Sequence, residues 1–208
     1  AAILSGNEAA VRVLLAHGAG PSAQVQKATP TLRGSGEYHF HQAFVGATPF
    51  WLAARFSQPD VMRLLLEYDV DPLFVHDVSY PAGNSARQFV ESEGAITALM
   101  AAVGMVQNEA RQAPESEAFE LVSVLVEQDI DVNAVNRRGR TAVHGAARLA
   151  RNSLISLLVD NGAAVDIADG RGQTPLDVGT VSRPLHPDTA RLLRHLGAIS
   201  GSETSGER

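Results

Sequence analysis

Cysteine is absent from the 208-residue chain. Disulfide bonds and thiolate-bound metal sites are therefore excluded, although this absence does not reveal the compartment in which the protein works. No apolar run approaches the roughly 18 to 20 residues that a membrane-spanning helix needs, so we expect no membrane partner. Aromatic residues are also few, at 5% of the chain with a single tryptophan.

An excess of basic residues is missing as well. Lysine and arginine number 17 against 23 aspartates and glutamates, which gives a formal net charge of −6. Proteins that bind the phosphate backbone of nucleic acids carry a basic stripe, so we expect no nucleic acid partner. With 45% hydrophobic and 19% charged residues, the composition suits one or two compact domains or one array of repeats.

Residues 136–168 form one complete small unit. A polar turn around Gly139 comes first, because glycine accepts the positive φ of a tight turn. Thr141 then offers a hydroxyl cap for a short helix, and Gly162 suits the left-handed cap of a second helix. Apolar residues in that second helix follow the i, i+3, i+4 pattern of a buried face. They are Leu154, Ile155, Leu157, Leu158 and Val159.

The pattern begins again at Asp169, 33 residues after Asn136, where D-G-R-G-Q-T-P-L repeats N-R-R-G-R-T-A-V. A period of 33 residues is typical of a turn followed by two helices in every repeat. Close variants of the motif G-x-T-[PA]-L-x-x-[AG]-A occur several times along the chain, and on these the chain resembles ankyrin repeat proteins. The resemblance implies an all-α fold, an ankyrin repeat solenoid.

Long insertions between repeats distinguish this chain. The sequence G-A-T-P-F-W-L-A-A after the lead-in H-Q-A-F-V resembles ankyrin proteins of bacteria with extracytoplasmic roles. The expected organisation is a truncated first repeat (1–24), an inserted loop (25–42), a repeat (43–75), a second inserted loop (76–91), a repeat with an insertion between its helices (92–135), a repeat (136–168), a C-terminal capping repeat (169–199) and a disordered tail (200–208). Because the chain starts inside a repeat, we expect it to be a fragment.

Two aspartates stand where Gly162 caps the second helix of its repeat. They are Asp69 and Asp129. Aspartate tolerates the left-handed conformation better than most residues, so we expect positive φ at Asp129. We also expect Leu157 and Leu158 to be buried between neighbouring repeats.

The sequence gives little indication of catalytic activity, so we expect neither catalytic residues nor a cofactor. No G-x-S-x-G, H-E-x-x-H or P-loop pattern occurs. His144 occupies the T-A-V-H position, where the ankyrin resemblance implies a structural ring that hydrogen-bonds neighbouring turns. His39 and His41 would point to one side of an extended segment and could share a metal. With only Glu37 nearby, this would be a weak site, and it remains an alternative.

Two groups of residues are candidates for contact with a partner. Arg137, Arg138 and Arg140 lie on one turn, and Arg148 lies at the end of the helix that follows. In ankyrin relatives, turns and first helices form the concave binding surface, so these arginines predict an acidic protein partner; a solvated turn is the alternative. The aromatic candidates for anchoring a partner are Tyr38, Phe40, Trp51 and Tyr80. They could instead tie the insertions onto the scaffold.

The sequence therefore predicts a monomeric, non-catalytic module that binds a protein partner through its concave face and its inserted loops. One alternative from another class is the regulatory or scaffolding part of a larger enzyme with its catalytic domain upstream.

Overall fold

The computed structural model describes residues 2–3, 5–28, 42–77, 94–105, 113–181 and 186–204. The elements in these ranges are α1 (Glu8–Ala16), η1 (Gln42–Phe44), α2 (Pro49–Arg55), α3 (Pro59–Leu66), β1 (Val75–His76), β2 (Ile96–Thr97), α4 (Ala98–Ala102), α5 (Glu115–Val126), α6 (Ala142–Arg148), α7 (Asn152–Asp160), α8 (Pro175–Val181), α9 (Pro187–His195) and α10 (Gly201–Thr204).

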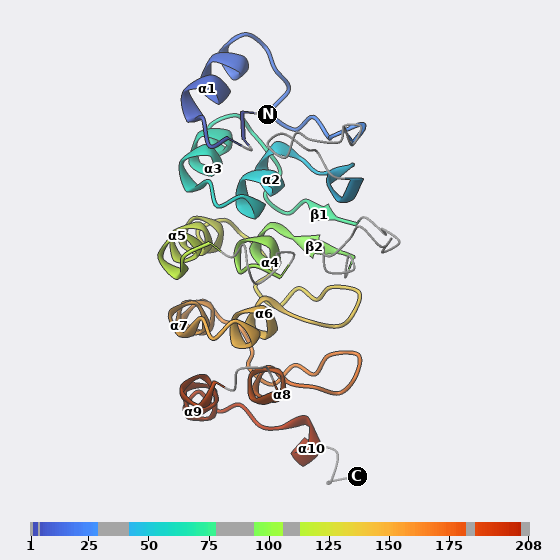
Figure 1. The fold of residues 1–208 in the computed structure, drawn as a ribbon, viewed down its shortest axis with the longest axis vertical. Coiled ribbons are helices and arrows are strands. Elements are labelled where there is room, and N and C mark those ends of the chain that lie inside the picture. Colours follow the sequence, from blue (N-terminus) through green and yellow to red (C-terminus); the bar gives the residue numbers. More distant parts are fainter. Residues whose placement is uncertain are drawn as a thin grey trace, which may run out of the picture.

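The helices stack in two columns along the length of the molecule (Figure 1). Helices α1, α3, α5, α7 and α9 form one column, and α2, α4, α6 and α8 form the column beside it, with loops projecting away from both. The antiparallel pair β1–β2 is the one sheet in the described ranges, with two residues in each strand. The prediction of an all-α repeat solenoid is confirmed.

Threonine and proline fix where the helices begin. Thr48 and Thr97 precede α2 and α4, and their hydroxyl oxygens accept hydrogen bonds from the backbone N–H groups of Trp51 and Met100. These bonds satisfy donors that the first turn of a helix leaves without partners. Proline is the first residue of α2, α3, α8 and α9, where its fixed φ favours a helix and its missing N–H costs nothing.

The turn between the two helices of a repeat depends on a residue with positive φ. This residue precedes the second helix by two positions in three of the repeats: Gly6 (φ 62°), Ser57 (φ 56°) and Ala150 (φ 54°). For a residue with a Cβ atom, the left-handed conformation costs about 1 to 2 kcal/mol.

Replacing Ala150 with glycine should therefore stabilise the protein by about 0.5 to 1 kcal/mol, the strain relieved minus the greater backbone entropy lost by glycine on folding. Chemical denaturation of the two proteins measures the difference. A lower denaturation midpoint for the glycine variant would contradict the left-handed conformation at this position.

The two aspartates at helix-cap positions behave differently. Asp69 has positive φ (53°), but Asp129 is not among the residues with positive φ, so the prediction for Asp129 was wrong. The end of α5 is completed in another way, since the Gln128 side chain donates to the carbonyl oxygen of Val124 (3.3 Å) and the Gln128 N–H donates to Leu125. An amide side chain thus takes over part of the capping, and no left-handed residue is needed there.

The core lies between the two columns and between successive repeats. Leu154, Ile155 and Leu158 of α7 are fully buried, as their spacing predicted. Leu157 is only partly buried, because it lies about 100° around the helix from Leu158 and faces the edge of the core.

The C-terminal segment differs from the expected disordered tail at 200–208. Residues 201–204 form the short helix α10, and Ser200 and Gly201 donate hydrogen bonds to the carboxylate of Asp177. Residues 205–208 lie outside the described ranges, as do most residues of the two expected inserted loops.

Candidate binding surface on the repeat turns

Two equivalent side chains hold the turns of the last two complete repeats. The Oδ1 atom of Asn136 accepts from the N–H groups of Arg138 (2.9 Å) and Arg140 (3.0 Å). One repeat later, Oδ1 of Asp169 accepts from the N–H groups of Arg171 (2.8 Å) and Gln173 (3.0 Å). The two turns also bond to each other, because Gly170 N–H donates to the Arg138 carbonyl oxygen at 2.7 Å. The turns therefore form a rigid, connected edge.

An ion pair links the same two turns. The Nε atom of Arg140 donates to Oδ2 of Asp169 at 2.9 Å, and the two side chains are only 17% and 1% exposed. Burial alone would raise the pKa of Asp169, but the bonds from Arg140 and from two backbone N–H groups outweigh it and hold that pKa below its ordinary value. Arg140 was predicted to contact an acidic partner, but its guanidinium already pairs with Asp169 inside the scaffold.

His144 carries a second link between repeats. Its Nδ1 accepts from the Thr141 N–H (3.1 Å), so its Nε2 carries the proton and donates to the Gln173 carbonyl oxygen at 3.1 Å. Burial lowers the pKa of His144, which favours this neutral form. The ring therefore has the structural role that the sequence implied.

Trp51 occupies the position of His144 two repeats earlier and makes the same bond. Its indole N–H donates to the Ile96 carbonyl oxygen at 2.9 Å, and its ring lies 4.4 Å from that of His76. The residue is 2% exposed. Trp51 was expected to anchor a partner, but it is a scaffold residue, because its ring and its only donor are used inside the stack.

The last repeat has Asp177 at this position. Its Oδ2 accepts from the backbone N–H (2.9 Å) and the hydroxyl (3.0 Å) of Thr174. A carboxylate has no proton to donate to a following repeat. Instead, it receives the hydrogen bonds of Ser200 and Gly201, so Asp177 ties the segment after α9 to the start of its own repeat.

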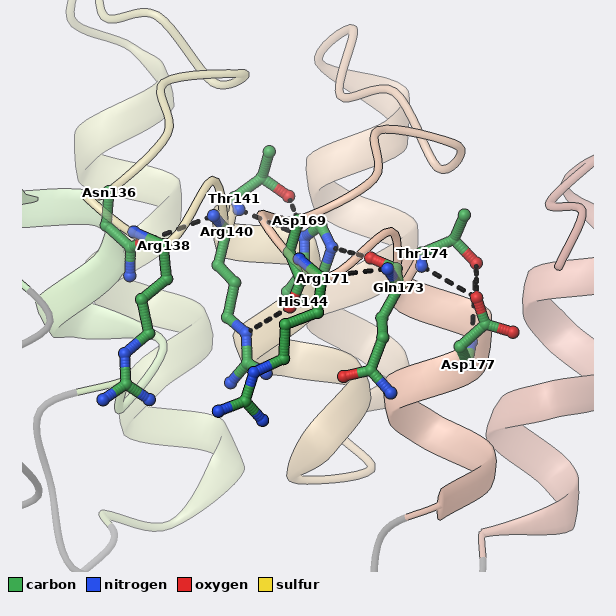
Figure 2. A network of polar contacts seen from close by, with 10 residues as sticks. All are labelled: Asn136, Arg138, Arg140, Thr141, His144, Asp169, Arg171, Gln173, Thr174 and Asp177. Carbon is green, nitrogen blue, oxygen red and sulfur yellow. Dashed lines mark hydrogen bonds and ion pairs between the residues drawn. The ribbon is translucent and has the colours of Figure 1, made fainter. Parts of the chain in front are cut away.

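Three arginine side chains extend from these turns on the same side (Figure 2). We call Arg138, Arg140 and Arg171 the arginine row. Arg171 is exposed and Arg138 is partly exposed, while Arg140 is held by Asp169. Arg171 was not predicted from the sequence, although it lies one 33-residue repeat after Arg138 and therefore at the equivalent position of the next turn.

The other predicted residues fall elsewhere. Arg137 is exposed and pairs with Asp77 at 2.7 Å, at the base of the second insertion. Arg148 lies at the other end of α6, about 10 Å along the helix axis from the turn. The aromatic residues Tyr38, Phe40 and Tyr80 and the proposed metal ligands His39 and His41 lie outside the described residues.

Within the described ranges, no group of three or more histidine, aspartate or glutamate side chains comes together in a way that could hold a metal ion. No helix in those ranges is long and apolar enough to cross a membrane.

Comparisons with known proteins agree with this architecture. A family model described as "Ankyrin repeats (3 copies)" matches residues 110–202, and one described as "Ankyrin repeat" matches residues 45–74. "Ankyrin repeat protein 14" of Vaccinia virus (strain Western Reserve) is 41% identical over 44 residues, which are 21% of this chain and 19% of the viral protein. The chain thus spans about a fifth of this relative. The stacked helix pairs, the histidine link between turns and these matches together show that the chain belongs to the ankyrin repeat family.

Proposed function

We propose that this chain binds an acidic segment of a partner protein along the arginine row. Ankyrin repeats generally mediate protein–protein interaction and are generally non-catalytic. The observation that carries the finer proposal is the arrangement of Arg138, Arg140 and Arg171, which extend on the same side from two bonded turns (Figure 2).

Local charge supports an acidic partner. In the part of the chain that the structure describes, the arginine row carries three guanidinium groups, and the carboxylate of Asp169 pairs with the guanidinium of Arg140, whereas the whole chain has a formal net charge of −6. This group of arginines therefore contrasts with the acidic balance of the chain as a whole. Because successive repeats present equivalent positions in the same direction, Arg138 and Arg171 can contact carboxylates at two places along one extended segment.

The scaffold reduces the cost of binding. The backbone around Arg138 and Arg171 is held by Asn136 and Asp169, and the two turns are bonded to each other through Gly170. A surface that is ordered before the partner arrives loses little conformational entropy on binding. The planar fork of donors in an arginine side chain suits bidentate contact with carboxylates.

Salt dependence tests this proposal. A partner captured from the organism that makes the protein should bind progressively more weakly as ionic strength rises beyond about 0.15 M, where the screening length falls to about 8 Å. Isothermal titration calorimetry across a salt series measures the effect. An affinity that does not change with salt would contradict an electrostatic contact.

The other predictions about function stay open. Contacts of Arg137, Arg148 and the inserted loops with a partner, the monomeric state, a bacterial extracytoplasmic location and a role within a larger enzyme remain predictions, and the proposal for the arginine row depends on none of them.

A further inference from the structure

Two equivalent pockets lie between successive repeats, on the loops that leave the second helices. The first pocket, of about 190 Å³, is lined in part by Pro21, Thr48 and Phe74. The second, of about 290 Å³, is lined by the corresponding loop residues one repeat later, among them Pro72, Thr97 and Ala134. The volume of the second pocket is therefore about half as large again as that of the equivalent first pocket.

Two substitutions explain the larger volume. Phe74 of the first pocket corresponds to Ala134 of the second. Phe74 follows Asp69 by five residues, and Ala134 follows the equivalent Asp129 by five residues. Phe50 likewise corresponds to Leu99, two residues after the capping threonine. Two phenyl rings thus narrow the first pocket, while a methyl group and an isobutyl group leave the second open.

A polar bridge closes the same place one repeat further along. Asn133 donates from Nδ2 to the Gly162 carbonyl oxygen (3.0 Å) and accepts at Oδ1 from the Ala164 N–H (2.8 Å), so it joins two consecutive loops. The equivalent residue at the second pocket is Leu73, which cannot form such a bridge and is 55% exposed. Val75 beside it is 44% exposed. Apolar surface is thus presented to solvent where the next repeat places an amide.

The charges at the second pocket indicate what binds there. Asp129 and Asp131 both line it and both are exposed, and they are the charged residues among its described lining residues. Asp131 is held in place because its Oδ1 accepts from the Asn133 N–H at 2.9 Å. An apolar cavity with two carboxylates beside it complements an aliphatic side chain flanked by a cation.

We propose that the pocket lined by Leu73, Val75, Leu99 and Ile130 is a second interaction site, which takes a leucine-like side chain from a partner segment with a lysine or arginine next to it. The aliphatic side chain fills the cavity, and the basic neighbour lies against Asp129 and Asp131. This site has the opposite charge preference to the arginine row and does not depend on it.

A short peptide tests the proposal on the whole chain. The probe is acetyl-Lys-Leu-Lys-amide, and the comparison peptides replace leucine with serine or both lysines with glutamate. Methyl NMR spectra should show saturable shifts of Leu73, Val75, Leu99 and Ile130 with the first peptide, and binding at least about tenfold weaker with each comparison peptide. Equal binding of the glutamate peptide would overturn the assignment of a basic partner. No methyl shift with the first peptide would overturn the site.

Variants of the protein separate the two components of recognition. Ala134→Phe copies the narrower neighbouring pocket and should abolish the methyl shifts, while Asp129→Asn with Asp131→Asn should weaken binding about three- to tenfold. If Ala134→Phe does not fold, Leu73→Asn removes an exposed apolar wall and should weaken binding instead. If Ala134→Phe, or Leu73→Asn where the first does not fold, binds the peptide as tightly as the unchanged protein, the peptide does not bind in this pocket. The reversal of Arg138 and Arg171 to glutamate should leave the shifts unchanged.

Discussion

Replacing Arg140 with glutamate should lower the free energy of unfolding by about 3 to 5 kcal/mol, the cost of leaving a buried charge without its partner. The Asp169 side chain is 1% exposed and its Oδ2 accepts from Arg140 at 2.9 Å. The new carboxylate would face a carboxylate that solvent cannot reach. Urea denaturation followed by circular dichroism measures the loss.

Arg171→Glu is the matched control. It makes the same change of charge one turn later, at an exposed side chain, and should change stability by no more than about 0.5 kcal/mol. The loss in Arg140→Glu should also shrink in acid. The depressed pKa of Asp169 means that its charge stabilises the fold above the ordinary carboxyl range, and this contribution is lost as pH falls through the folded-state pKa. Equal stability of the two variants at neutral pH would contradict a structural role for the pair.

Leu158→Ala should cost about 2 to 5 kcal/mol, because it removes a fully buried side chain and leaves a cavity between repeats. Leu14 is the control, since it precedes Gly18 by four residues as Leu158 precedes Gly162. Its side chain is 52% exposed on α1, so Leu14→Ala should cost less than about 1 kcal/mol. Thermal unfolding of both variants gives the comparison. Similar midpoints would mean that α7 does not bury the predicted face.

The 33-residue period allowed the fold to be predicted because each turn repeats the same local requirements. A residue with positive φ, a threonine cap and an apolar helix face are local properties, and all three can be recognised in one repeat and found again in the next. The bond from His144 to Gln173 followed from the same regularity.

Local patterns were insufficient where a neighbouring repeat decides the outcome. Asp169 holds the guanidinium of Arg140 from a turn 29 residues away, and the sequence around Arg140 contains no sign of this. Trp51 donates to a carbonyl oxygen 45 residues further along the chain, so its aromatic character alone suggested the wrong role. At Asp129, an adjacent glutamine caps the helix, and position within the repeat did not predict it.

The ordered part of the tail and the place of Arg171 in the arginine row were missed for different reasons. Small polar residues at the C-terminus suggested disorder, but Asp177 offers acceptors to Ser200 and Gly201. Arg171 was passed over because it belongs to a different turn from the conspicuous cluster at 137–140. Only the stacking of the turns brings it to the same side as Arg138 and Arg140 (Figure 2).

The most direct test of the proposed function is the association rate of the captured partner with the double variant Arg138→Glu/Arg171→Glu. Its control is Arg191→Glu/Arg194→Glu, which makes the same change of charge on exposed residues of α9. Exposed charges mainly affect the rate at which two proteins associate. Stopped-flow measurements at low salt should therefore show association at least about tenfold slower for the first variant than for the control, with similar dissociation rates. Equal association rates for the two double variants would contradict binding through the arginine row.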